Sequence, residues 1–109
     1  MNYKIVNTLE FQKEIKHLSK KYPSLHDDFE IFLNQLSKNP FQGTSLGNNF
    51  YKVRLAISSK GKGKSGGARV ITYLRIAAET VLLISIYDKS EKSTITEKEI
   101  KERLKRFPA

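Results

Sequence analysis

Residues 51–87 read YKVRLAISSKGKGKSGGARVITYLRIAAETVLLISIY, and this stretch decides the fold. In its first part apolar and basic side chains alternate, which is typical of a strand with one buried face. The apolar side chains of that strand are Val53, Leu55 and Ile57, and the basic ones are Lys52 and Arg54. Residues 68–76 and 80–87 give two more strands, and the last is almost entirely apolar and therefore predicted to be central. Short connections favour antiparallel pairing, so the stretch predicts an antiparallel meander of three strands.

The segments on either side of this meander predict helices and one further strand. The expected elements are a strand over residues 2–7, helices over 11–22 and 25–36, a loop over 41–49 and a last helix from Thr96. Thr96 and Glu99 have the spacing of a capping box, which marks where that last helix begins. The predicted fold is a single α+β domain, residues 1–109, with the order β-α-α-β-β-β-α and a helical hairpin on one face of the sheet.

The charge of the chain is strongly positive and unevenly distributed. The formal net charge is +9, and no acidic residue occurs between Glu30 and Glu79. The basic residues in this interval are Lys38, Lys52, Arg54, Lys60, Lys62, Lys64, Arg69 and Arg75. An unmixed basic segment favours a polyanion such as nucleic acid as the partner. The alternatives to a nucleic-acid partner are that the positive charge has no function or that the partner is an acidic protein.

One face of the predicted sheet combines cations with aromatic rings. The residues opposite the apolar faces of their strands are Lys52, Arg54, Arg69, Tyr73 and Arg75. We expect this face to be open to water and to bind RNA, with Tyr87, Lys89 and Lys92 beside it. The loop that carries Lys60, Lys62 and Lys64 is either a mobile hairpin loop or, as we favour, a basic arm for the RNA backbone.

Several other classes of protein and site are disfavoured by the composition. The chain has no cysteine, which excludes disulfides and thiolate chemistry. His17 and His26 fall on the two N-terminal helices, away from the basic face, and no acidic pair lies near that face. We therefore predict neither a metal site nor a cofactor. The sequence has neither a signal peptide nor an apolar run of membrane-spanning length, so a cytoplasmic protein without membrane contact is expected.

Two runs of sequence are similar to a known family. YKVRLAISSKGKGKSGGARVITYL and VLLISIYDKSEKSTITEKEIKERL resemble the RelE/HigB superfamily of toxin–antitoxin toxins, above all HigB-type members with a KGKGK-x-GG-x-R loop. The resemblance covers residues 50–104. It implies a RelE-like fold and a ribosome-dependent endoribonuclease that cuts mRNA in the A site. It also implies a cognate antitoxin, through which alone the toxin would meet DNA.

The resemblance also implies which residues form the site. Lys52, Arg54, Arg69, Lys89 and Lys92 match basic positions of the family. RelE-like toxins often carry a catalytic tyrosine where this chain has Ile95 and Thr96, so Tyr73, Tyr87 or a lysine is expected to take that role.

The expected reaction is attack by the RNA 2′-OH on the adjacent phosphate, which needs neither water nor a metal ion. Arg69, helped by Arg54, would neutralise the phosphate, and Lys52 or Lys89, surrounded by other cations, would exchange protons. A ParE-like inhibitor of gyrase without nuclease activity and a non-catalytic RNA- or DNA-binding module are the alternative functions.

Overall fold

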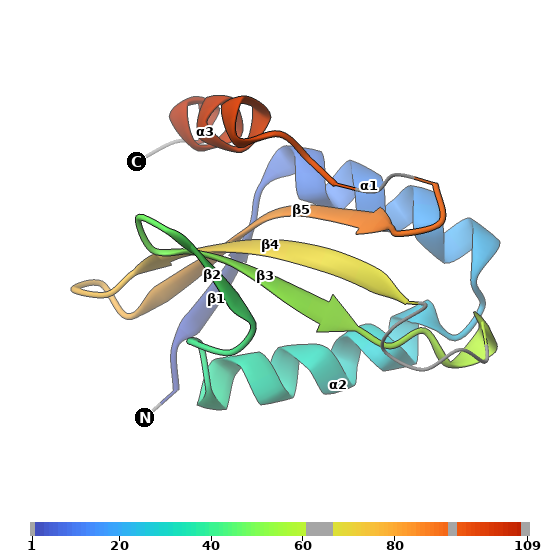
Figure 1. The fold of residues 1–109 in the computed structure, drawn as a ribbon. Coiled ribbons are helices and arrows are strands. Elements are labelled where there is room, and N and C mark those ends of the chain that lie inside the picture. The colour runs from blue at the N-terminus through green and yellow to red at the C-terminus, as the bar shows by residue number, and fades with distance from the viewer. Residues whose placement is uncertain (1, 61–66, 92–93, 108–109) are drawn as a thin grey trace.

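The residues described in this computed structural model, 2–60, 67–91 and 94–107, form one sheet with helices on both sides (Figure 1). The strands are β1 Lys4–Asn7, β2 Thr44–Gly47, β3 Phe50–Leu55, β4 Ala68–Arg75 and β5 Thr80–Asp88. The helices are α1 Leu9–Lys21, α2 Leu25–Lys38 and α3 Glu97–Arg106, with a 3-10 turn η1 at Ser58–Lys60. The predicted α+β class is confirmed, and β2 is an additional strand.

The strand order is β1-β5-β4-β3-β2, so β5 is an interior strand between β1 and β4, in line with its apolar sequence, and β4 is the middle strand. Strands β3, β4 and β5 form the expected antiparallel meander, and β1 pairs in parallel with the first half of β5, from Lys4 opposite Thr80 to Asn7 opposite Leu83. Thr8 joins this pair to α1, because its hydroxyl accepts from the Phe11 amide at the helix start and donates to the Leu83 carbonyl at 2.8 Å. None of the helices among the described residues is long and apolar enough to cross a membrane.

Part of the segment 41–49, which was expected to be a loop, is a strand. β2 pairs with β3 in antiparallel fashion, and Asn48 and Asn49 turn the chain between them with positive φ angles of 52° and 68°. Asparagine tolerates this backbone region, which tight hairpin turns require. Gly43 lets β2 start close to β3, since a Cβ there would lie 2.5 Å from the Lys52 carbonyl oxygen. The hairpin adds an edge to the sheet beside the basic residues of β3.

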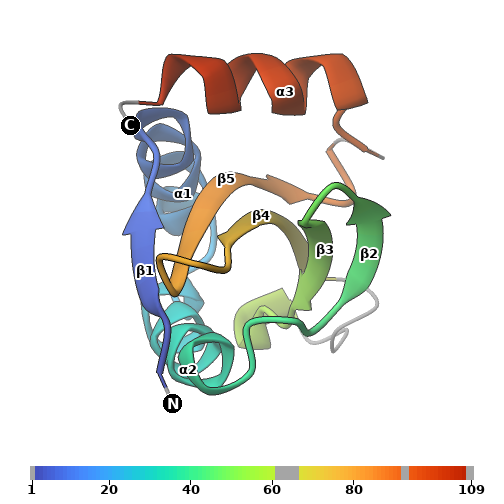
Figure 2. The ribbon, with the colours of Figure 1, turned by 90° about the vertical axis from the view of Figure 1, so that its left-hand side faces the viewer.

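Both faces of the sheet are buried over part of their area. α1 and α2 cover one face, where Phe11, Leu25 and Leu36 pack against strand residues such as Leu74. α3 covers part of the other face and forms a second core, which contains Phe50, Ile71, Leu82, Ile84, Ile95 and Ile100 (Figures 1 and 2). The expectation that this second face is entirely open to water is therefore wrong for the half that lies under α3. The open half lies toward the ends of β3 and β5.

A β-bulge in β5 changes which side chains face α3. Ile71 of β4 pairs with Ser85 and the next residue, Thr72, pairs with Leu83, so Ile84 is an extra residue on β5. Because of this insertion, Ile86 continues the core under α1, and Tyr87 lies on the side of α3. The bulge therefore brings Tyr87 to the same face as the basic residues of β3 and β4.

Candidate functional site

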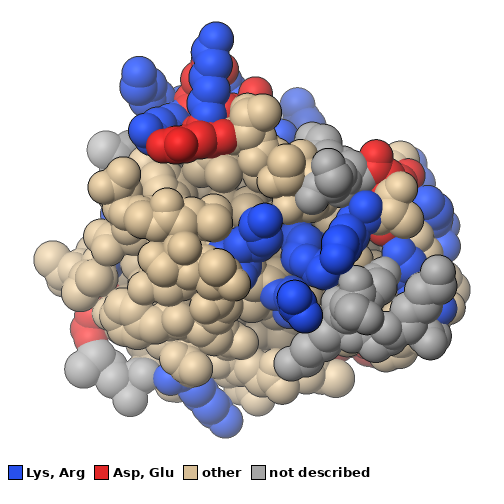
Figure 3. All heavy atoms as spheres, viewed as in Figure 1, with Lys and Arg blue, Asp and Glu red and all other residues tan. Residues whose placement is uncertain are grey.

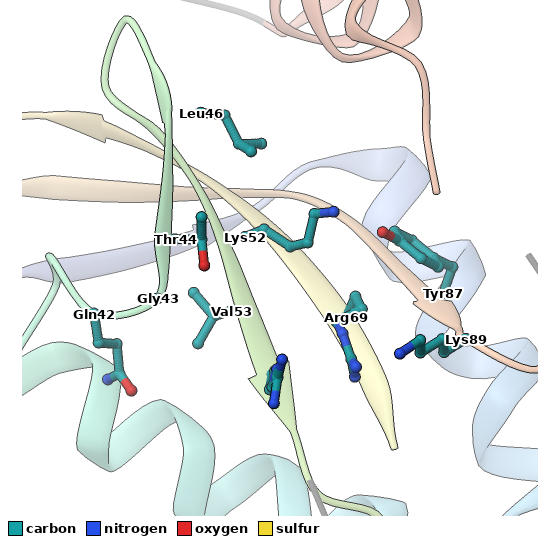
Figure 4. A pocket seen from close by; sticks show the side chains of 10 residues that line it. Gln42, Gly43, Thr44, Leu46, Lys52, Val53, Arg69, Tyr87 and Lys89 are labelled. Atoms are coloured by element: carbon teal, nitrogen blue, oxygen red, sulfur yellow. The ribbon is translucent and has the colours of Figure 1, made fainter. Parts of the chain in front are cut away.

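A pocket of about 470 Å³ opens on the half of the second face that α3 leaves uncovered. It is lined by Gln42, Gly43, Thr44, Leu46, Lys52, Val53, Arg54, Arg69, Tyr87 and Lys89 (Figure 4). Four of these side chains are cationic and none is acidic. Figure 3 shows the same imbalance on the surface, since Lys and Arg side chains gather in the middle of this face and acidic side chains lie near its margins. We call this cavity the basic pocket.

Strand pairing aligns three residues of the basic pocket in one row across the sheet. Arg54 on β3 is the partner of Arg69 on β4, and Arg69 is in turn the partner of Tyr87 on β5. Lys52 lies two residues before Arg54 on the same face of β3, and Lys89 follows the end of β5. The alternation of β3 and the end of β4 thus explains why these cations converge.

The cations differ in how firmly they are held. Arg69 is 5% exposed, and its guanidinium donates to the Ala68 carbonyl at 3.1 Å, whereas Arg54 and Lys89 are exposed and Lys52 is half-buried. Burial restricts the guanidinium of Arg69 to few positions, which suits a fixed contact with an anion. Figure 4 shows the Lys89 side chain directed toward Arg69, so a bound anion would meet both groups.

Tyr87 contributes a buried hydroxyl group to the wall of the basic pocket. The residue is 5% exposed, and its hydroxyl has no hydrogen-bond partner among the residues that the structure describes. The side chains of Lys52 and Tyr87 point toward one another from β3 and β5 (Figure 4). Buried hydroxyls are nearly always paired, so one that lacks a partner at a pocket wall is ready to bond a ligand.

The structure brings the four predicted catalytic residues, Lys52, Arg54, Arg69 and Lys89, to one pocket together with Tyr87. Tyr73 and Arg75 lie apart from it. The Tyr73 ring packs 4.8 Å from that of Phe50 in the core under α3, and the Arg75 guanidinium lies 5.6 Å from the ring centre of Phe107. These contacts hold both side chains away from the basic pocket.

Among the other predicted RNA-binding residues, Lys60 is engaged inside the protein. Its ammonium group lies 2.8 Å from the buried carboxylate of Asp88 and over the ring of Tyr22. Its side chain is only 10% exposed, so this charge is neutralised internally and little of it reaches solvent. Lys62, Lys64 and Lys92 lie outside the described residues.

Asp88 fixes the end of β5, next to Lys89. Its carboxylate accepts hydrogen bonds from Tyr22, Lys60 and the Ser90 amide. Burial by itself would raise the pKa of Asp88, but these hydrogen bonds outweigh burial and hold the pKa well below its usual range. Sequence reasoning missed this residue, because an acidic residue after a strand looks like ordinary surface.

The sequence interpretation also missed the wall that β2 contributes to the basic pocket. Gln42, Thr44 and Leu46 fall within the segment expected to be a loop, and the pair Asn48-Asn49 was the available signal of a hairpin. In the part of the chain that the structure describes, no group of three or more His, Asp or Glu residues has the proximity of a metal site.

Comparison with known proteins places these features in a family. A family model described as "RelE toxin of RelE / RelB toxin-antitoxin system" matches residues 4–107. Among solved structures, the chain is similar to a double arginine-to-alanine variant of the E. coli toxin RelE in the free state. The two are 17% identical, the TM-score is 0.64, and the match covers 99% of this chain and 100% of that one.

Two further structures share the fold. The isolated E. coli RelE toxin is 17% identical, with a TM-score of 0.60 and coverage of 95% of this chain and 97% of that one. A chain of the RelBE2 toxin–antitoxin complex from Mycobacterium tuberculosis is 14% identical, with a TM-score of 0.59 and coverage of 81% and 99%. At this identity the likeness is one of fold.

Proposed function

This chain belongs to the RelE toxin family of toxin–antitoxin systems, and from that premise we propose that it is a ribosome-dependent endoribonuclease that cuts mRNA in the A site. The observation that carries the proposal is the basic pocket, in which four cations and one buried hydroxyl meet without a carboxylate. An RNA phosphate and its leaving oxygen need this combination of charge and proton donor.

The proposed reaction is transfer of the phosphorus from one RNA oxygen to another. The 2′-oxygen forms a bond to the adjacent phosphorus, and the bond from phosphorus to the 5′-oxygen breaks. The 2′-OH gives up a proton and the leaving 5′-oxygen gains one, so the products are a 2′,3′-cyclic phosphate and a 5′-OH. The protein must neutralise the negative charge that grows on the phosphate oxygens and move these protons.

Arg69 and Lys89 suit the charge on the phosphate. A guanidinium presents two parallel N–H donors, and that of Arg69 is held rigidly in the sheet. Lys89 adds a second positive charge from the end of β5. The exposed Arg54 is placed to guide a neighbouring phosphate of the RNA rather than the one that reacts.

Lys52 and Tyr87 suit the proton transfers. The two side chains face each other across the basic pocket, and the Tyr87 hydroxyl has no partner in the described part of the chain. We assign this hydroxyl to the leaving 5′-oxygen, which would take its proton, and Lys52 to the stabilisation of the resulting phenolate. The proton of the 2′-OH would pass to solvent, and solvent would return a proton to the phenolate after cleavage. This assignment gives Tyr87 the role for which the family often uses a tyrosine elsewhere in the chain.

The proposal includes a cognate antitoxin as the partner that neutralises the toxin. The M. tuberculosis relative was solved as a toxin–antitoxin complex. A protein that silences this chain has to cover or distort the basic pocket, and both the ribosome and such a partner place the activity in the cytoplasm. Co-purification with the product of a small neighbouring gene, and loss of toxicity on co-expression, would test this part.

The test of cleavage is primer extension on a reporter mRNA in a translating extract. Wild type should produce new 5′ ends inside the reading frame only when the message is translated. Arg69→Ala should abolish them, and Arg75→Ala, which removes an arginine of the same strand outside the basic pocket, should not. Intact transcripts with normal translation would instead favour a gyrase-inhibiting toxin or a binding module.

A further inference from the structure

A second, smaller cavity of about 200 Å³ adjoins the basic pocket on the same face of the molecule. It lies between the β2–β3 hairpin and the start of α3, and Leu46 and Lys52 line both cavities. A ligand that occupies the basic pocket can therefore extend into the second cavity past Lys52. The volume is below the roughly 300–1,000 Å³ typical of sites for drug-sized ligands, so it suits one ring system of a larger ligand.

The inner wall of this cavity is apolar. Phe50, Ile71, Ile95 and Ile100 line it, and each is no more than 7% exposed. These side chains come from β3, β4, the segment that leads into α3 and α3 itself, so four parts of the fold hold the wall in place. Unstacked RNA bases are bound by apolar and aromatic walls of this kind.

The mouth of the cavity is polar and includes a carboxylate. Asn48, Thr94, Glu97 and Lys101 line it. The Glu97 side chain is 78% exposed and is paired with Lys101 at 2.9 Å, an i,i+4 contact that lowers the pKa of Glu97 from its ordinary value. The basic pocket has no carboxylate in its lining. A carboxylate repels phosphate but accepts hydrogen bonds from the exocyclic amino groups of bases, so the two cavities differ in the part of a nucleotide that they fit.

We propose that the second cavity binds the nucleobase next to the cleaved phosphate, and that Glu97 favours a base with an exocyclic amino group. The inference rests on the proposed function, because it takes the phosphate in the basic pocket to be that of RNA. The second cavity would allow the toxin to distinguish bases, whereas the basic pocket recognises only charge. The choice of cleavage position would then depend partly on the toxin itself.

The first test is sequencing of the 5′ ends that wild type, Glu97→Gln and Glu102→Gln produce in a translating extract. Glu102 lies on the same helix but does not line the second cavity. Wild type should favour amino-bearing bases at one position beside the cut. Glu97→Gln should weaken that preference about fivefold, because a neutral amide oxygen replaces the charged acceptor, and Glu102→Gln should preserve it. An unchanged base distribution in Glu97→Gln would overturn the assignment of Glu97.

The second test does not depend on cleavage. Methyl NMR spectra of wild type would be recorded with 2′-deoxy trinucleotides, which lack the attacking 2′-OH and cannot be cleaved. Ribose 5-phosphate, which has no base, would be the control. The trinucleotides should shift the methyl signals of Ile71, Ile95 and Ile100, and ribose 5-phosphate should not. Shifts without cleavage in the extract would retain the base site and refute the nuclease. Cleavage without any base-dependent shift would retain the nuclease and refute the base site.

Discussion

Arg54 and Arg69 are direct partners on β3 and β4, so two positive side chains stand opposite each other on the same face of the sheet. Like charges in this position destabilise a sheet, and Arg69 is buried as well. Selection for stability alone would not favour such a pair. Both guanidinium groups line the basic pocket, and this arrangement suits a polyanion, whose negative charge would lie next to both of them when it binds.

Replacing one arginine of this pair should stabilise the free protein. Arg54→Thr removes the like-charge contact and places a good strand former on β3, so the free energy of unfolding should rise by about 0.2–1 kcal/mol. Urea denaturation at low salt measures the change. Arg75→Thr is the matched control on β4, because Arg75 has no arginine as cross-strand partner. A lower stability of Arg54→Thr would mean that Arg54 contributes more to packing than to charge.

Inorganic phosphate should stabilise wild type more than Arg69→Ala. A ligand that binds only the folded state adds RT ln(1 + [L]/Kd) to the free energy of unfolding. Arg69 lies between Arg54 and Tyr87 in the row across the sheet, so the loss of its guanidinium should remove most of the phosphate effect on the melting temperature. Arg75→Ala should keep that effect. Equal stabilisation of all three proteins would place the anion site outside the basic pocket.

The Tyr87 hydroxyl should matter for cleavage and not for folding. Because it has no partner among the described residues, Tyr87→Phe should change the free energy of unfolding by less than about 0.5 kcal/mol. Cleavage should fall about 100-fold or more, as expected when a proton donor is lost. Primer extension with timed sampling measures the rate. Tyr73→Phe, a tyrosine in the core under α3, is the control and should cleave as wild type does.

Asp88 should make the stability of the protein depend on pH in the acid range. Its folded-state pKa lies below the unfolded value near 3.8, so the carboxylate stabilises the fold fully above that value and less as the pH falls toward the folded pKa. Asp88→Asn should therefore flatten the acid side of the stability curve. At neutral pH the variant should lose about 3 kcal/mol, because Lys60 is then left buried without its counter-charge.

A double-variant cycle checks that this loss comes from the ion pair. Lys60→Met should restore part of the stability to Asp88→Asn, since no unpaired ammonium group remains. Additive losses in chemical denaturation would show that the two side chains act independently.

The alternation of residues on β3 was sufficient to predict Lys52 and Arg54 on the face that holds the basic pocket, and Arg69 followed from the same pattern on β4. The position of Tyr87 could not be predicted in this way, because β5 is apolar on both faces and gives no sign of the bulge at Ile84. The cover of α3 over Tyr73 was missed for a related reason. The sequence shows that α3 has an apolar face but not which part of the sheet it covers.

The bulge depends on contacts between residues far apart in the sequence. The carboxylate of Glu14 on α1 accepts from the Ser85 hydroxyl at 3.0 Å and from the Ile86 amide at 3.2 Å. Arg103 on α3 binds the same carboxylate through two N–H groups, at 2.8 and 2.9 Å, and donates to the Ile84 carbonyl at 3.1 Å. These bonds satisfy backbone groups of β5 beyond Leu83, the last residue of β5 that pairs with β1.

Arg103→Leu should therefore destabilise both the fold and the site. Glu14 would keep a largely buried charge without its bidentate partner, which should cost about 2–4 kcal/mol in urea denaturation. Arg106→Ala is the matched control, because that arginine is 53% exposed in its ion pair with Glu10 and should cost less than about 1 kcal/mol. Hydrogen exchange at the Ile86 amide should accelerate in Arg103→Leu alone, as β5 loosens next to Tyr87. Equal costs for the two variants would show that the bulge is stable without Arg103.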